Sequence, residues 1–163
     1  ETLKNLYFKG KKTWFIREES EVEGVKAEVA FAQAMMETGF LKFGGDVKKD
    51  QYNFAGIGAI GGGSSGAKFD SIRIGIRAHV QHLKAYASKE ALKQPVVDPR
   101  FQYVKRGSAE YVQWLGQKEN PNGYGWATAK NYGNNIVKLY ILPMKKYWWN
   151  QSIPNRRKNG MLF

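Results

Sequence analysis

The sequence predicts a mainly α-helical domain with an irregular lobe on one side. Apolar residues recur at three- and four-residue steps in two long stretches, which is typical of helices that bury one face. No segment is dominated by the alternation of apolar and polar residues that half-buried strands show. Eight glycines between positions 44 and 66 interrupt regular structure and mark the irregular lobe.

The length of 163 residues fits one domain. We expect that domain over residues 20–143, with an N-terminal segment over 1–19 and a basic aromatic tail over 144–163. The N-terminal segment contains Asn5-Leu6-Tyr7-Phe8-Lys9-Gly10, one residue away from a common engineered protease site, so a cloning remnant and a natural docking segment both stay open. For the tail, a partner-binding patch, an ordered flap and a solvated end stay open.

A first helix is predicted from Ser20 to Glu37. Ser20 is a suitable N-cap with Glu23 as its capping-box partner, and Gly39 is a natural stop after the last turn. The buried face of this helix is expected to consist of Val22, Val25, Val29, Ala32 and Met36.

Glu37 lies at the margin of this apolar face, about 100° around the helix from Met36, with Gln33 one turn before it. Partly apolar surroundings disfavour the charged form of a carboxyl group. We therefore expect the pKa of Glu37 to be raised, so that it can donate a proton near neutral pH. The simpler interpretation is a solvated glutamate that ends a surface helix.

The segment after this helix combines glycines with aromatic residues, among them Phe43, Tyr52 and Phe54. Glycine lets the backbone approach a ligand closely, and aromatic faces stack on sugar rings or bases. We interpret the segment as a binding loop rather than a linker, since linkers seldom carry so many aromatic residues. Its GxG run lacks the strand and the lysine that nucleotide-binding loops need, so no nucleotide site is expected.

A second helix is predicted to follow a cap at Asp70 or Ser71, with an apolar face that continues to Ala87. His79 and His82 have a spacing that suits a metal, but no third ligand stands at a recognised spacing. We therefore expect packing or surface histidines, no metal and no cofactor. A short helix near residue 108 and a last helix over 130–142, stopped by a proline at 143, complete the prediction.

Lys and Arg number 26 against 14 acidic residues, a formal charge of +12 that favours an anionic partner. Nucleic acid, a membrane surface and an acidic cell wall fit the charge, but no RNA-recognition or zinc-finger signature is present, so nucleic acid is not expected. The absence of Cys excludes disulfides and a catalytic thiol. No stretch of the sequence suits a bilayer span, and its start lacks a signal-peptide core.

A series of motifs over residues 20–142 resembles the glucosaminidase domain of glycoside hydrolase family 73. A single E-T-G would be unspecific, whereas an ordered series over most of the chain is specific. The motifs are Glu23-Gly24-Val25, Phe31-Ala32-Gln33-Ala34-Met35-Met36-Glu37-Thr38-Gly39, Phe43-Gly44-Gly45-Asp46-Val47, Asn53-Phe54-Ala55-Gly56-Ile57-Gly58-Ala59, Gly75-Ile76-Arg77-Ala78, His82-Leu83-Lys84-Ala85-Tyr86-Ala87, Asp98-Pro99-Arg100-Phe101, Trp126-Ala127 and Tyr132-Gly133-Asn134-Asn135-Ile136.

The resemblance implies a lysozyme-like fold, mainly α, in which a small irregular or β-containing lobe flanks a substrate groove. It also implies hydrolysis of the β-1,4 bond after N-acetylglucosamine in bacterial peptidoglycan, as in autolysins and phage endolysins. Glu37 falls on the family's general acid, and Tyr132 falls on the tyrosine that positions the sugar's acetamido group or a water. Substrate-binding residues are expected at Gln33, Tyr52, Asn53, Phe54, Gly56 and Trp126.

On this resemblance we expect a monomer that acts without a cofactor on peptidoglycan strands, outside the cell or delivered to the wall by a phage. Anionic wall polymers such as teichoic acids are further expected partners, in keeping with the positive charge. An N-acetylmuramidase acting on the same polymer and a catalytically silent wall-binding module stay open as alternatives.

One departure from the family concerns the second carboxylate. Many relatives carry a second Glu in a longer hairpin, whereas residues 61–66 here are glycine and serine. Asp46 is the best substitute, ahead of Asp50 and Asp70. Carboxyl groups about 5 Å apart would favour a retaining mechanism, and about 6.5–9.5 Å an inverting one. A third route uses the substrate's N-acetyl oxygen as nucleophile, and we favour it slightly.

Overall fold

The computed structural model describes residues 11–59 and 61–148. In this part the chain is mainly helical, and Gly116 and Ala127 form an isolated bridge outside any strand. The mainly α, lysozyme-like fold is confirmed, and the small lobe is irregular rather than a sheet across the described residues. The protease-site-like run at residues 5–10 and residues 149–163 of the predicted tail lie outside the described residues.

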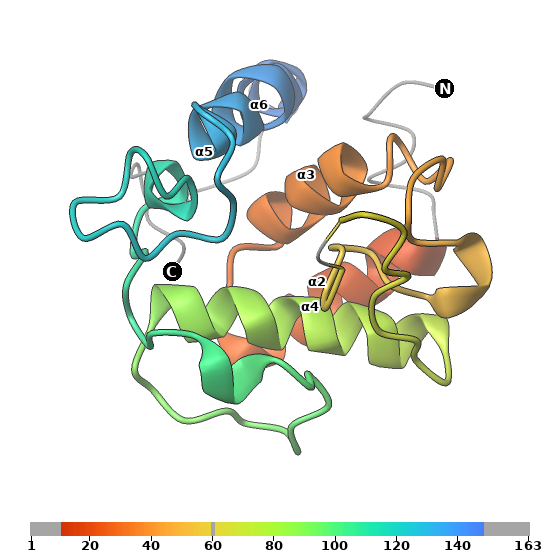
Figure 1. The fold of residues 1–163 in the computed structure, drawn as a ribbon. Coiled ribbons are helices and arrows are strands. Elements are labelled where there is room, and N and C mark those ends of the chain that lie inside the picture. The colour runs from red at the N-terminus through yellow and green to blue at the C-terminus, as the bar shows by residue number, and fades with distance from the viewer. Residues whose placement is uncertain (1–10, 60, 149–163) are drawn as a thin grey trace.

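The fold is organised around helix α3, which contacts α2, α4 and the helical arm near the C-terminus (Figure 1). Residues Val29 to Met35 of α3 are all buried, so this helix forms the centre of the hydrophobic core. The helices are α2 (Lys11–Glu23), α3 (Ala27–Glu37), η1 (Lys49–Gln51), α4 (Ile72–Ala87), η2 (Phe101–Tyr103), η3 (Val112–Leu115), α5 (Tyr132–Asn135), η4 (Ile136–Ile141) and α6 (Leu142–Trp148).

The prediction of one helix from Ser20 to Glu37 is wrong, because the chain turns at Gly24. Gly24 has a φ of +75°, and the amide of the next residue, Val25, donates to the Ser20 carbonyl at 2.9 Å, which ends α2 in a left-handed turn. Ser20 is thus a buried residue inside α2 and not an N-cap. After the break Val25 and Val29 enter the core as predicted, whereas Val22 before it is 46% exposed and does not belong to the buried face.

Helix α2 is fixed to α4 by two buried glutamates. Glu19 is fully buried and accepts from Arg73 Nε at 2.7 Å and Arg77 Nε at 2.9 Å. Glu23 is also buried, and Lys84 Nζ donates to its backbone carbonyl at 2.7 Å. Buried charges are tolerated when they are paired and hydrogen-bonded, so these contacts define how α2 docks. Helix α2 runs across residue 20, where the catalytic domain was expected to begin.

Helix α4 agrees with the prediction. It begins at Ile72, and the Ser71 hydroxyl caps it by accepting from the Ile74 amide at 3.2 Å. The short helix expected near residue 108 is instead the 3₁₀-helix η3, which begins at Val112.

The C-terminal arm continues past Pro143, so the predicted stop at this proline is wrong. The stretch before it, η4, is a π-helix, in which the Leu142 amide donates to the Val137 carbonyl. A proline inside a helix leaves a backbone acceptor without its donor and crowds the preceding turn. The wider π turn accommodates both effects, and Met144 beyond the proline is buried in the core.

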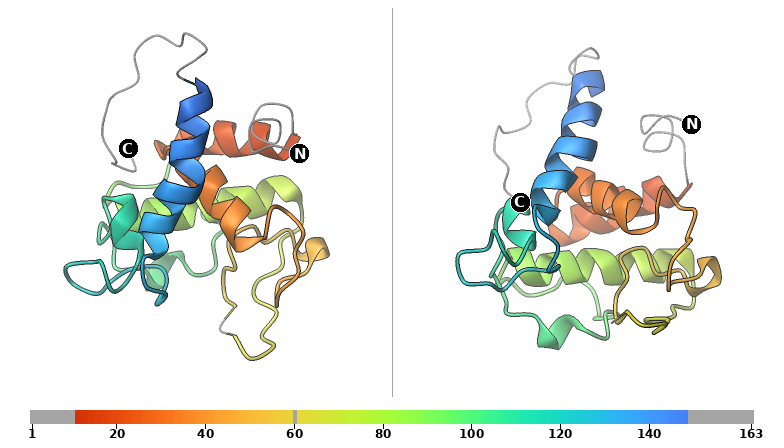
Figure 2. Two further views of the ribbon diagram at one scale, coloured as in Figure 1. Left: turned by 90° about the horizontal axis from the view of Figure 1, so that it is seen from above. Right: turned by 45° about the horizontal axis from the view of Figure 1, so that its top comes forward.

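The irregular lobe follows α3 and lies at one end of α3 and α4, whereas residues 112–131 lie at the other end (Figure 2). None of the described helices combines the length and the apolar character needed to cross a membrane. This arrangement brings the end of α3, the loop before α4 and the start of α5 toward a common region.

Candidate active site

Glu37 is the last residue of α3. The helix ends there because the Thr38 hydroxyl donates to the Ala34 carbonyl at 2.6 Å and accepts from the Leu41 amide at 2.8 Å. The Glu37 carboxylate faces the loop before α4, since a Cβ atom at Gly56 would lie 3.7 Å from Glu37 Oε2. A glycine at this position lets the backbone approach the carboxylate closely.

Tyr132 is the first residue of α5 and lies against Glu37. A Cβ atom on the next residue, Gly133, would collide with the Val112 carbonyl oxygen, so the glycine lets α5 pack closely on η3. This packing directs the Tyr132 side chain toward α3, where its hydroxyl donates to Glu37 Oε1. The Tyr-Gly pair therefore has a structural reason: the glycine positions the tyrosine.

Three buried side chains from α3, α4 and α5 form a polar chain that ends on the exposed Glu37. Gln33 Nε2 donates to the Tyr132 hydroxyl at 2.9 Å, and Gln33 Oε1 lies 2.8 Å from His79 Nε2. Gln33 and His79 are fully buried, and Tyr132 is nearly so. The polar chain thus runs His79–Gln33–Tyr132–Glu37.

The hydrogen bonds of this polar chain all point toward Glu37. Burial, with a smaller contribution from His82, lowers the pKa of His79 to about 3, so His79 is neutral. Because Gln33 Oε1 can only accept, His79 Nε2 carries the ring hydrogen. His79 Nδ1 is then a bare acceptor, and it finds no hydrogen-bond partner among the described residues. Because the Tyr132 hydroxyl oxygen accepts from Gln33, its hydrogen is free to point at the Glu37 carboxylate.

The pKa of Glu37 is raised mainly by partial burial of its carboxyl group, and the hydrogen bond from Tyr132 opposes this rise. The residue nevertheless keeps an exposed face, so a ligand can reach it. Burial and the neighbouring Glu37 hold the pKa of Tyr132 well above its ordinary value, which keeps it protonated. This direction agrees with the raised pKa expected of Glu37.

Replacing Glu37 with Gln is expected to stabilise the domain at pH 8 but not at pH 4. The unfolded carboxyl titrates near about 4.3, and the folded one titrates higher. Between these values the folded state binds more protons, so wild-type stability falls as pH rises through the interval. Glutamine cannot ionise and escapes this loss. Urea denaturation at both pH values measures the difference, with Glu21→Gln on the exposed side of α2 as a control.

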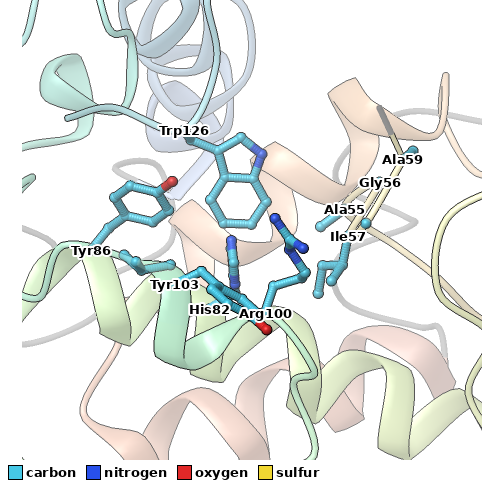
Figure 3. Close-up of a pocket in the computed structure, with 11 residues that line it drawn as sticks. Ala55, Gly56, Ile57, Ala59, His82, Tyr86, Arg100, Tyr103 and Trp126 are labelled. Carbon is cyan, nitrogen blue, oxygen red and sulfur yellow. The ribbon is translucent and has the colours of Figure 1, made fainter. Parts of the chain in front are cut away.

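An aromatic pocket lies beside the polar chain (Figure 3). It has a volume of about 200 Å³ and shares Gly56 with the surroundings of Glu37. Trp126 forms one wall, with its ring 4.6 Å from the His82 ring and nearly perpendicular to it. The lining residues are Ala55, Gly56, Ile57, Gly58, Ala59, His82, Tyr86, Arg100, Tyr103, Val104 and Trp126.

Two of the six predicted substrate-binding residues, Gly56 and Trp126, line this pocket. The prediction is wrong for Gln33, whose buried amide is engaged in the polar chain. It is wrong for Asn53, because its buried side chain holds the loop by donating to the Ile57 carbonyl at 2.9 Å. The Asn53 side chain thus fixes the backbone at Ile57, a residue that lines the pocket.

The aromatic residues of the loop are also not part of the pocket lining. Phe54 is buried in the core with its ring 5.8 Å from that of Phe43. Tyr52 is half-buried and packs on the core with a left-handed φ of 51°. Both residues therefore hold the loop against the core. The burial of Phe54 corrects its assignment to substrate binding, and a contact of Tyr52 with substrate stays a prediction.

Among the lining residues that sequence reasoning missed, four carry polar or charged side chains: His82, Tyr86, Arg100 and Tyr103. The helical spacing offered a signal for the first two, since residues four apart share one face of α4. His82 is oriented by the buried Asp98, whose Oδ2 lies 2.6 Å from His82 Nδ1. Within the described part of the chain, no three His, Cys, Asp or Glu side chains are grouped to hold a metal ion.

None of the three substitute carboxylates joins the polar chain or the pocket lining. Asp46 is exposed in the turn after Phe43, and Asp50 forms an exposed pair with Lys68 at 3.3 Å. Asp70 is exposed directly before the cap of α4. Among the described carboxyl groups, Glu37 is the one that the polar chain reaches.

Comparison with known proteins identifies the family of the chain. The model of the glucosaminidase family, described as mannosyl-glycoprotein endo-beta-N-acetylglucosaminidase, matches residues 14–142. The chain belongs to the glucosaminidase family. An uncharacterized protein of Borreliella burgdorferi is 47% identical over 124 residues, which are 76% of this chain and 57% of that protein. The chain thus spans little more than half the length of this relative, and no solved structure matches it.

Membership of the glucosaminidase family indicates a glycoside hydrolase domain. The match begins at residue 14, inside α2, and ends at residue 142, at the start of α6. It therefore includes Glu37, Tyr132 and the whole pocket.

Proposed function

We propose that this glucosaminidase cleaves the β-1,4 bond that follows N-acetylglucosamine in peptidoglycan, with Glu37 as its general acid. The observation that carries the proposal is the Glu37 carboxyl, whose pKa is raised while one face stays open beside an aromatic pocket. A glycosidase acid must hold its proton near neutral pH and still touch the substrate. The raised pKa of Glu37 and its open face support this role.

In the proposed reaction Glu37 gives its proton to the glycosidic oxygen as the bond from that oxygen to C1 breaks. The carboxylate that forms needs stabilisation, and the hydroxyl of Tyr132 supplies a hydrogen bond to Oε1. His79 and Gln33 support this bond, because they hold the tyrosine with its hydrogen directed at Glu37. General acid catalysis of this kind contributes about 10²–10⁴-fold to the rate.

We further propose that the acetamido oxygen of the same N-acetylglucosamine attacks C1 as the leaving sugar departs. Water then opens the cyclic intermediate, and the Glu37 carboxylate takes up one of its protons, which restores the acid. The support is that Asp46, Asp50 and Asp70 all lie outside the pocket lining. The pocket lining contains no carboxylate, and its aromatic residues suit a sugar with its acetamido group.

Two alternatives are weaker on specific grounds. A silent wall-binding module would gain nothing from a raised-pKa carboxyl in contact with a buried tyrosine. An N-acetylmuramidase would act on the same polymer with the same acid, and only its products distinguish it. The formal charge of +12 supports an anionic wall as the place of action, with teichoic polymers as additional partners.

Product analysis tests the bond that is cut. Purified peptidoglycan strands are digested, reduced with borohydride and analysed by mass spectrometry. We expect N-acetylglucosaminitol at the new ends, because the proposed cut leaves N-acetylglucosamine as the reducing sugar. New ends that carry N-acetylmuramitol would identify a muramidase and contradict the proposed specificity.

A further inference from the structure

Arg100 brings a positive charge into the aromatic pocket. Its side chain reaches between Trp126 and the loop that carries Gly56 and Ala59 (Figure 3). The guanidinium carbon lies 4.7 Å from the centre of the Tyr103 ring, which supports it from one side. Arg100 is exposed, so the guanidinium remains available to a ligand.

This guanidinium has no acidic partner among the described residues. The nearest carboxylate along the chain, Asp98, is buried and already occupied. Its Oδ2 pairs with His82, and its Oδ1 accepts from the backbone amide of Arg100 at 2.8 Å, which fixes the backbone and not the guanidinium. The ion pairs of the described chain involve Asp50, Glu18, Glu19, Glu23, Glu90 and Asp98, and none of them includes Arg100.

Among the residues that line the pocket, Arg100 is the one with a permanent charge, because His82 is paired with Asp98 and the others are neutral. A planar guanidinium matches a carboxylate through two parallel hydrogen bonds. In peptidoglycan such carboxylates belong to the muramic acid unit, either on its lactyl group or on the stem peptide. N-acetylglucosamine carries none.

We propose that Arg100 binds a carboxylate of the muramic acid unit and makes the pocket selective for peptidoglycan over uncharged polymers of N-acetylglucosamine. This inference rests on the proposed function, which it extends to the neighbouring sugar. Glu37 cuts the chain, and Arg100 selects which chain is cut.

The test compares wild type and Arg100→Gln on three kinds of glycan strand. Amidase-treated strands expose the lactyl carboxylate, the same strands after chemical amidation of that group are neutral, and untreated strands carry stem-peptide carboxylates. Loss of a charged two-point contact is expected to lower kcat/KM by about 10- to 100-fold on the strands that supply the carboxylate. Neutral strands are expected to be cleaved equally by both proteins. The strand that shows the loss identifies the source.

Two further variants control for other effects of the charge. Lys105→Gln removes a nearby charge that lies over Tyr124 and outside the pocket lining, and we expect it to leave kcat/KM unchanged. Arg100→Lys keeps the charge without the planar fork and is expected to recover only part of the rate. An equal loss on neutral and charged strands, or no loss on any strand, would overturn the proposal.

Binding to the Glu37→Gln protein separates this inference from the cleavage reaction. N-acetylmuramic acid, muramyl dipeptide and N-acetylglucosamine are titrated and followed by NMR. At least one of the two acidic probes is expected to bind about tenfold or more tightly than N-acetylglucosamine, and Arg100→Gln is expected to remove that difference. If the wild type cleaves no strand, the proposed function fails and this titration alone decides. Equal affinities for all three probes would then refute the role of Arg100.

Discussion

Glu37→Gln is expected to lower kcat for peptidoglycan hydrolysis by about 10²–10⁴-fold, the usual contribution of a general acid. Glutamine has nearly the same shape as glutamic acid, and it can accept the hydrogen bond from Tyr132. It has no proton to give to the leaving sugar. The rate of release of reducing ends from purified strands measures the effect.

The matched control is Glu21→Gln, which makes the same chemical change at an exposed site of α2. It should leave the rate within error of the wild type. Circular dichroism of both variants confirms that the helices are retained. Hydrolysis by Glu37→Gln at the wild-type rate would remove Glu37 from the reaction.

Tyr132→Phe is expected to lower kcat by about 10- to 100-fold, because the carboxylate formed in the reaction loses a charged hydrogen bond. The same hydrogen bond lowers the pKa of Glu37 in the wild type, whereas burial raises it. Its removal lets the pKa rise further. The alkaline limb of the pH–rate profile should therefore move to higher pH, which a purely structural effect would not produce.

Tyr111→Phe is the matched control for this variant, since Tyr111 is exposed and its ring packs on Trp114 outside the polar chain. It should change neither the rate nor the pH profile. A Tyr132→Phe protein with a reduced rate and an unmoved alkaline limb would show that the tyrosine does not tune Glu37.

Local signals predicted the parts of the fold that depend on neighbouring residues. The cap at Ser71 and the start of α4 at Ile72 follow from hydrogen bonds within one turn. The raised pKa of Glu37 follows from its place at the end of an apolar helix. The break at Gly24 was not predicted because Val22 continues the apolar spacing of Val25 and Val29 in the sequence, although Val22 is exposed in the structure.

The polar chain could not be read from the sequence, because it joins residues far apart in the chain. Gln33 lies 46 positions before His79 and 99 before Tyr132. A polar residue beside Glu37 suggested a contact with substrate. A buried amide, however, is stable where all of its hydrogen bonds are made inside the protein, and those partners come from α4 and α5. Asn53 was misjudged for the same reason.

The most direct test of the account is the pKa of Glu37 itself. Carboxyl carbon NMR of the wild type across a pH titration measures it, with Glu37→Gln to assign the signal. We expect a pKa above the ordinary glutamate value, equal to the alkaline limb of kcat/KM, since a general acid acts only while protonated. An ordinary pKa, or an alkaline limb that titrates elsewhere, would contradict Glu37 as the proton donor.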